Sequence, residues 1–273
     1  MLERRVMDWD DAYANGPNIP GGDRWPNAWV APAQAFRDGL GSRALLDKPY
    51  GERARNRFDL FMPERAPKGL TVFVHGGFWM RLDKSLWSQL AAGPLAHGWA
   101  VAMPSYTLCP EIRIAGIVQE IAAAIEAAAE LVEGPIALTG HSAGGHLAAR
   151  MVAAGTPLSP STQRRVRNLV SISGLHDLRP LMKTAMNDVL LIDEAEALAQ
   201  SPALLRPLEG VRVTCWVGGS EREEFKRQND LLANVWTGLG ATTCAITEPD
   251  RHHFNVIDGL IDPEHPLTRA LLS

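Results

Sequence analysis

The chain has 273 residues, a hydrophobic fraction of 46%, a charged fraction of 21% and a formal net charge of −4. This composition is ordinary for a globular protein of one domain, and the mild negative charge disfavours a nucleic-acid partner. We find neither an apolar run of membrane-spanning length nor a signal-peptide pattern, so we expect a cytoplasmic protein with no membrane partner. The three cysteines show no spacing typical of a disulfide framework or a zinc ribbon.

The first 50 residues are rich in proline, glycine, asparagine and tryptophan and show little periodicity, so we expect an irregular segment that packs on the main domain. From residue 57 onwards, apolar strands alternate with helical patterns. The expected strands cover residues 58–62, 70–75, 98–104, 135–139, 168–173, 211–217 and 241–247, and the expected helices cover residues 85–96, 114–132, 143–153 and 223–239. This alternation indicates an α/β fold, with a mostly parallel sheet and helices on both faces.

Residues 176–210 lie between two of these strands and form a longer connection than a plain crossover needs. They contain two helical patterns, at residues 178–186 and 194–200. We therefore expect a small cap beside the carboxyl end of the sheet, within a single domain that covers residues 1–273.

Residues 140–146 read GHSAGGH and place Ser142 between a short apolar strand and a helix. A G-x-S-x-G nucleophile elbow requires this setting, in which the serine stands on a sharp turn above the sheet. Gly140 and Gly144 avoid collisions with the neighbouring strand and helix. The Ala143 amide is the first of the helix and can donate a hydrogen bond to a developing oxyanion. The alternative interpretation is a glycine-rich turn with an idle serine.

A second glycine turn, HGGFW at residues 75–79, follows another apolar strand. Tetrahedral intermediates need two or more amides that converge on one oxygen. We expect the amides of Gly77 and Phe78 to complete an oxyanion hole with Ala143, and we expect His75 to bond the loop.

The general base is expected after the serine and the acid in the chain. Two adjacent histidines follow the last strand, and we favour His253 over His252 because it precedes an apolar residue and opens a helix-like run. His141 fills the variable position of the elbow. His146 follows on the helix and is expected to pack or cap.

The triad acid is expected in a loop that follows a strand. Glu221 follows the strand at residues 211–217, and Asp177, after the preceding strand, is the second candidate. Glu223 and Glu224 suit the start of the next helix, where acidic side chains favour the helix dipole.

Metal chemistry has little support in the sequence. There is no H-E-x-x-H motif, and His252 and His253 are too close together to chelate one metal well. We expect no metal and no cofactor.

Five stretches together resemble the arylformamidase (kynurenine formamidase) type of α/β-hydrolase, over roughly residues 50 to 262. They are HGGFW (75–79), PSYTLCPE (104–111), GHSAGGH (140–146), VGGSEREEF (217–225) and HHFNVI (252–257). The chain departs from this family at two positions: Glu221 stands where the acid is commonly Asp, and His252 replaces an Asp.

The resemblance implies an α/β-hydrolase fold and a serine hydrolase that converts N-formylkynurenine to kynurenine and formate in tryptophan degradation. It implies a small-molecule substrate, and we expect a monomer or homodimer. The aromatic leaving group needs a flat apolar site, for which the candidates are Phe78, Trp79, Trp87 and Tyr106. One alternative is a carboxylesterase or thioesterase acting on small acyl esters. A less favoured alternative is a non-catalytic binding protein of the same fold.

Overall fold

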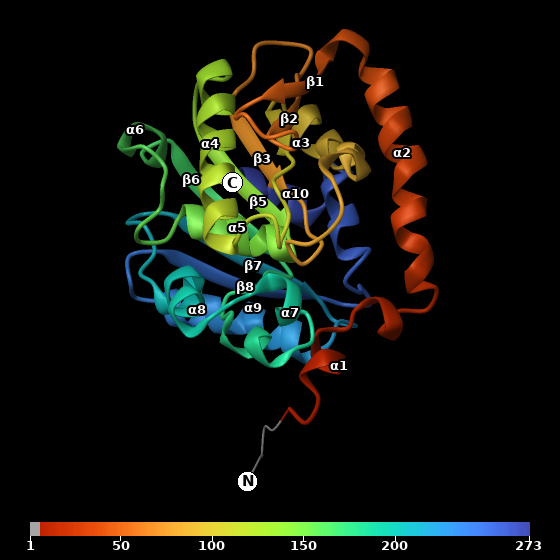
Figure 1. The fold of residues 1–273 in the computed structure, drawn as a ribbon. Helices are drawn as coiled ribbons and strands as arrows, with labels where there is room; N and C mark the ends of the chain where they lie inside the picture. Colours follow the sequence, from red (N-terminus) through yellow and green to blue (C-terminus); the bar gives the residue numbers. More distant parts are fainter. Residues whose placement is uncertain (1–5) are drawn as a thin grey trace.

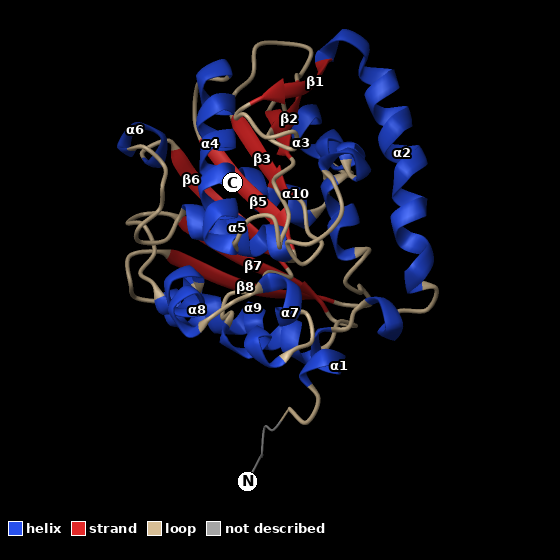
Figure 2. Cartoon of the chain, in the orientation of Figure 1, coloured by secondary structure: helices blue, strands red, loops and turns tan. Residues whose placement is uncertain are grey.

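The computed structural model describes residues 6–273; the first five residues of the expected N-terminal segment lie outside this range. A central eight-stranded sheet is flanked by helices (Figures 1 and 2). The strands are β1 (Ala44–Pro49), β2 (Arg57–Phe61), β3 (Leu70–Val74), β4 (Ala100–Pro104), β5 (Ile136–His141), β6 (Val166–Ile172), β7 (Arg212–Gly218) and β8 (Thr242–Glu248).

The α-helices lie between and around these strands. They are α1 (Trp9–Tyr13), α2 (Trp25–Leu40), α3 (Ala92–Ala96), α4 (Ile114–Leu131), α5 (Ala143–Met151), α6 (Pro160–Gln163), α7 (Asn187–Leu190), α8 (Glu194–Gln200), α9 (Glu223–Trp236) and α10 (Pro266–Leu272). No helix in residues 6–273 is both long enough and apolar enough to cross a membrane.

The strand order is β1-β2-β4-β3-β5-β6-β7-β8. β2 pairs antiparallel with β1 and with β4, whereas the pairs from β4 to β8 are all parallel. The predicted α/β-hydrolase fold with a mostly parallel sheet is confirmed. In this topology the carboxyl ends of the parallel strands meet at one edge, where loops from different strands can build one site.

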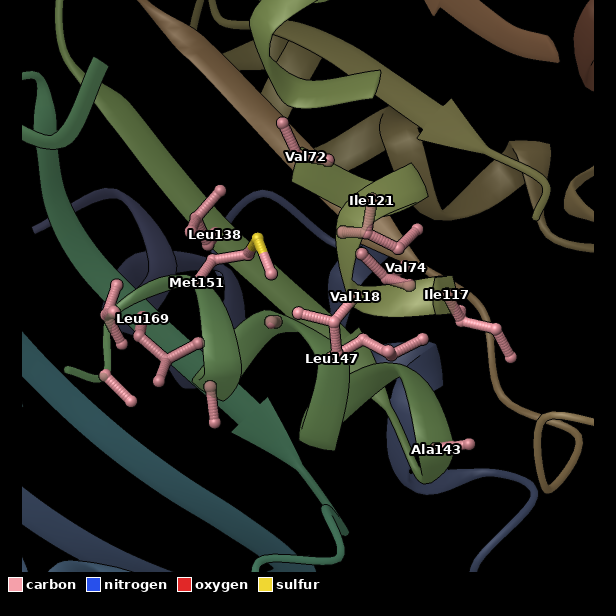
Figure 3. Packing of buried hydrophobic residues seen from close by; sticks show 14 of the residues in the cluster. Val72, Val74, Ile117, Val118, Ile121, Leu138, Ala143, Leu147, Met151 and Leu169 are labelled. Atoms are coloured by element: carbon pink, nitrogen blue, oxygen red, sulfur yellow. The ribbon is translucent and has the colours of Figure 1, made fainter. Parts of the chain in front are cut away.

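The central strands are buried on both faces, which explains their continuous apolar sequences. All five residues of β3 are buried, and alternate side chains enter two separate apolar clusters. Figure 3 shows one of these clusters, in which Ile117 and Val118 of α4 and Leu147 of α5 lie over Val74 of β3. The other cluster contains residues of α2 and α10. This packing fixes the strand ends that carry the candidate site.

The expectation of an irregular segment over residues 1–50 is wrong for its second half. α2 spans 16 residues and buries Trp29 and Ala33, and β1 adds an edge strand. Pro32 inside the helix weakens the helical pattern. The helix packs against the second cluster through Trp25, Trp29, Phe36 and Leu40, which recur at helical spacing.

The helix expected at residues 85–96 is also wrong in its extent. The chain forms two short 3-10 helices, Lys84–Leu86 and Ser88–Ala91, before the five-residue α3. Pro94 has no amide hydrogen and disfavours helical geometry at the preceding residue, so a continuous α-helix is costly here.

The stretch from 176 to 210 contains a 3-10 helix at Arg179–Lys183, α7, α8 and a further 3-10 helix at Pro202–Leu204. Figure 1 shows α1 at the lower edge of the molecule, and its contacts include the 3-10 helix at Arg179–Lys183. The Ala185 amide donates a hydrogen bond to Asp10 Oδ1 at 2.7 Å, which ties this stretch to the N-terminal segment.

Candidate active site

Ser142 stands on a sharp turn between β5 and α5. Its backbone has φ 56° and ψ −119°, a conformation that few non-glycine residues adopt and that often marks a functional position. Its amide donates to the Ile172 carbonyl at 2.8 Å. A Cβ atom on Gly144 would lie 1.9 Å from the Val74 carbonyl oxygen, so only glycine allows α5 to approach β3 this closely. The local geometry is that of a nucleophile elbow.

A buried histidine–carboxylate pair comes from two loops at the same edge of the sheet. His253 Nδ1 lies 2.6 Å from Glu221 Oε2, and both side chains are almost fully buried. The other carboxylate oxygen, Oε1, accepts hydrogen bonds from Ser173 Oγ at 2.6 Å and from the Gly218 amide at 2.8 Å. Glu221 is therefore held in one orientation and fixes the imidazole, which leaves Nε2 for proton exchange.

The competing candidates lie elsewhere. Asp177 pairs with Arg179 at 2.9 Å, with no contact to His253. His252 packs edge-on against Trp25 and is absent from the lining of the cavity that contains Ser142. The geometry brings Glu221 and His253 together, as the preferred sequence interpretation expects.

Two nearby histidines have structural contacts. His75 Nδ1 donates to the Gly76 carbonyl at 2.7 Å, and its ring stacks on Tyr106. His146 Nε2 donates to the Gln200 carbonyl at 2.7 Å. Burial lowers the pKa of His75 to about 4 and that of His146 to about 3, so both rings stay neutral at pH 7.

His141 has a closer relation to the site than its variable motif position suggested. Its ring lies 4.5 Å from the His253 ring, centroid to centroid, and it lines the same cavity as Ser142. Burial, followed by the proximity of His253, holds the pKa of His141 well below its usual range. His141 therefore packs against His253 as a neutral ring. The sequence offers no signal for this contact, which needs two distant loops to meet.

The glycine turn at residues 75–79 lies directly against the serine. A Cβ on Gly76 would be 3.1 Å from Ser142 Cβ, and Gly77 has φ 110°. Phe78 also has a positive φ, of 51°. Within residues 6–273, the amides of Gly77, Phe78 and Ala143 donate no hydrogen bond to another protein group. These amides remain available to an oxyanion.

Ser142 and His253 open into one cavity of about 1020 Å³. Much of its wall comes from the N-terminal segment, through residues 13–23 together with Pro26 and Trp29. From the expected cap at residues 176–210, only Met186 lines this cavity. The N-terminal segment therefore covers the site to a greater extent than the stretch that sequence reasoning selected. Its low periodicity gave no sign of this role.

Two of the four aromatic residues expected to bind substrate line the cavity: Phe78 and Trp87. The expectation is wrong for Trp79 and Tyr106, which are fully buried outside its lining. The Trp79 ring packs edge-on against His146, and the Tyr106 hydroxyl donates to the His75 carbonyl at 3.0 Å. Both side chains therefore pack against residues of the loops around the site and do not face the cavity.

The described residues hold no group of three or more His, Cys, Asp or Glu side chains arranged to bind a metal ion. Ser142, His253 and the glycine turn instead line one cavity, and Glu221 is hydrogen-bonded to His253. These groups are suited to acyl transfer through a serine nucleophile.

The fold and this arrangement define an α/β-hydrolase, and the chain is an enzyme of that type. The chain belongs to the BD-FAE family, whose model matches residues 58–203, more than half of its length. Among curated proteins it is similar to a kynurenine formamidase of Danio rerio, with 26% identity over 85% of this chain and 82% of that protein. A kynurenine formamidase of Drosophila melanogaster is 27% identical over 84% of this chain and 77% of that protein.

Solved structures give a second comparison. A putative thioesterase from Silicibacter sp. TM1040 is 50% identical, with a TM-score of 0.93 over 98% of this chain and 100% of that one. Esterase B from a Lactobacillus species shares the fold at 19% identity, with a TM-score of 0.64 over 89% of this chain and 91% of that one.

Proposed function

We propose that the protein is a serine hydrolase that cleaves N-formylkynurenine to kynurenine and formate. Ser142 is the nucleophile, His253 the general base and acid, and Glu221 the orienting carboxylate. The observation that carries the proposal is that His253, which lines the same cavity as the strained Ser142, is paired with the buried Glu221 at 2.6 Å. The substrate follows from the kinship with kynurenine formamidases over 85% of the chain.

The reaction proceeds by two acyl transfers. His253 Nε2 takes the Ser142 proton as Oγ attacks the formyl carbon, and the amides of Gly77, Phe78 and Ala143 stabilise the oxyanion. His253 then returns the proton to the aniline nitrogen as the C–N bond breaks. Water, deprotonated by His253, attacks the formyl ester, and proton return to Ser142 releases formate.

The aromatic leaving group suits the walls of the cavity. Phe78, Trp87, Trp29 and Phe254 all line it and provide flat apolar surfaces for an aryl ring. The scissile formyl group is small, so it can sit between Ser142 and the glycine turn, where Gly76 approaches the serine closely.

A small-acyl carboxylesterase or thioesterase is the second candidate. The same catalytic groups would serve it, and the 50% identical structure is described as a putative thioesterase. A non-catalytic binding protein is disfavoured because it would have no use for the His253–Glu221 pair beside the cavity that Ser142 lines.

The proposal extends to a cytoplasmic enzyme that needs no cofactor and acts as a monomer or homodimer. Its three cysteines are unpaired, which is usual in a reducing compartment.

Steady-state kinetics on N-formylkynurenine and p-nitrophenyl acetate tests the proposal, with Ser142→Ala as the control. We expect kcat/KM to be much higher for the formamide and the variant to be inactive on both substrates. Turnover of the ester alone would support the esterase alternative. Unchanged activity in Ser142→Ala would exclude this serine as the nucleophile.

A further inference from the structure

One cationic side chain in the cavity wall has no role in the chemistry above. Arg81 lines the cavity, and its guanidinium carbon lies 5.8 Å from the centre of the Phe78 ring. Across residues 6–273 it forms no salt bridge, whereas Arg179 and Arg222 pair with Asp177 and Asp11. A cation left unpaired beside an aromatic surface is available to an anionic group of a ligand.

The position of Arg81 is fixed by the turn that carries the proposed oxyanion amides. The amides of Met80 and Arg81 both donate to the Gly77 carbonyl at 3.1 Å. A Cβ on Gly77 would lie 3.3 Å from Arg81 Cγ and 2.2 Å from the Arg81 carbonyl oxygen, so the arginine packs closely against this turn. One short turn therefore holds both the amides beside Ser142 and a cation farther along the wall.

The other charges of the cavity complement this cation. Asp10 and Asp23 also line the wall, and Asp10 is anchored by the Ala185 amide at 2.7 Å. Most of the remaining surface is aromatic or aliphatic, with Phe78 and Trp29 as large contributors. Arg81, Asp10 and Asp23 are exposed residues of a largely apolar cavity wall. A cation and two carboxylates beside aromatic surfaces match a zwitterion attached to an aryl ring, whereas an uncharged ester would leave these charges unpaired.

We propose that Arg81 binds the α-carboxylate of the substrate's amino-acid end and determines specificity for N-formylkynurenine over uncharged aryl formamides. The inference rests on the proposed function and names a residue for one end of that substrate. The guanidinium presents a planar fork of donors that matches a carboxylate, while Asp10 and Asp23 attract the ammonium group.

Arg81→Met tests the inference, because methionine keeps an unbranched apolar stem against Phe78 and removes the charge. We expect KM for N-formylkynurenine to rise about tenfold or more with kcat nearly unchanged, since a hydrogen-bonded ion pair is lost in both ground and transition states. For formanilide, which has no carboxylate, kcat/KM is expected to stay within about twofold. Arg81→Lys should recover part of the affinity.

Arg24→Met is the matched control, because Arg24 is an exposed arginine of the N-terminal segment that lies outside the cavity lining. Arg24→Met should leave kcat and KM unchanged for both substrates. This result would distinguish a local contact of Arg81 from a general effect of the lost charge. Equal losses on N-formylkynurenine and formanilide in Arg81→Met, or no loss on either, would overturn the role of Arg81 alone. No hydrolysis of N-formylkynurenine by the unaltered protein would overturn the proposed function and this inference with it.

Discussion

Glu221 Oε2 and His253 Nδ1 lie 2.6 Å apart, although 32 positions separate them in the chain. Glu221 follows β7, whereas His253 follows β8, and β7 and β8 are parallel neighbours at the end of the sheet. The pair therefore forms because adjacent parallel strands deliver their following loops to one edge.

Glu221→Gln is expected to lower kcat by about a hundredfold to ten-thousandfold, because a neutral amide cannot stabilise the imidazolium that forms during acyl transfer. Glu221→Asp keeps the charge but shortens the side chain, so it should retain more activity than the amide. Both are measured by steady-state kinetics on the substrate that the unaltered protein turns over. Equal activity of Glu221→Gln and the unaltered protein would contradict the assignment of the acid.

Ser173→Ala is expected to lower kcat about tenfold with little change in KM, because it removes a hydrogen bond to a charged oxygen that positions Glu221. The Gly218 amide still bonds Oε1, so the loss should be smaller than for Glu221→Gln. Ser171→Ala is the control, since Ser171 Oγ contacts His176. Similar losses in the two serine variants would point to a general packing defect.

Tyr13→Phe is expected to raise KM several-fold and to lower the free energy of unfolding by about 1 kcal/mol. The Tyr13 hydroxyl donates to Glu224 Oε1 at 2.8 Å and joins the N-terminal wall of the cavity to α9. Tyr50→Phe removes a part-buried hydroxyl contact, to the Ser105 carbonyl, away from the cavity. Tyr50→Phe should lower the free energy of unfolding without a change in KM. An equal rise in KM in both tyrosine variants would argue that the N-terminal wall does not contact the substrate.

Stability is expected to fall as the pH drops below about 6.5, the ordinary pKa of histidine. Burial lowers the pKa of His75 to about 4 and that of His146 and His176 to about 3. Below pH 6.5 these histidines therefore bind protons in the unfolded chain, whereas the same buried rings stay neutral in the folded protein. The contribution of these neutral rings is complete above pH 6.5 and is lost as the pH falls towards 4 and 3, at about 1.4 kcal/mol per pH unit for each ring.

Thermal unfolding at pH 7.5, 6.5, 5.5 and 4.5 measures this dependence. His146→Gln removes one buried ring and should show a shallower fall in Tm, whereas His97→Gln changes a half-buried histidine near the surface as a control. An unchanged slope in His146→Gln would show that this histidine does not take part in the acid response.

The glycine turn and the elbow were predictable because their signals are local. Ser142 needs a strand, a sharp turn and a helix within a dozen residues, and glycines mark the positions where the backbones touch. The same holds for the order of strands and helices along the chain, since each buried strand carries its own apolar run. Helix α2 was not predicted although its apolar residues recur at helical spacing, because Pro32 and the proline- and glycine-rich residues before it obscure that pattern.

The tertiary structure decided what the local patterns left open. It selected Glu221 over Asp177 by placing one loop beside His253 and pairing the other with Arg179. In the folded protein Trp79 and Tyr106 lie outside the cavity lining, and the N-terminal segment forms much of the cavity wall.

The sequence by itself determined the fold class and the nucleophile elbow, because apolar periodicity and short-range sterics dictate them. It also narrowed the base and the acid to a few candidates in loops that follow strands. Only the folded chain decided which side chains meet around the cavity. Tyr13 and Glu224 are 211 positions apart, and their contact depends on how the whole sheet and its helices pack. Local sequence patterns do not reveal contacts between residues so far apart in the chain. The residues that form the cavity wall are therefore known only from the folded structure.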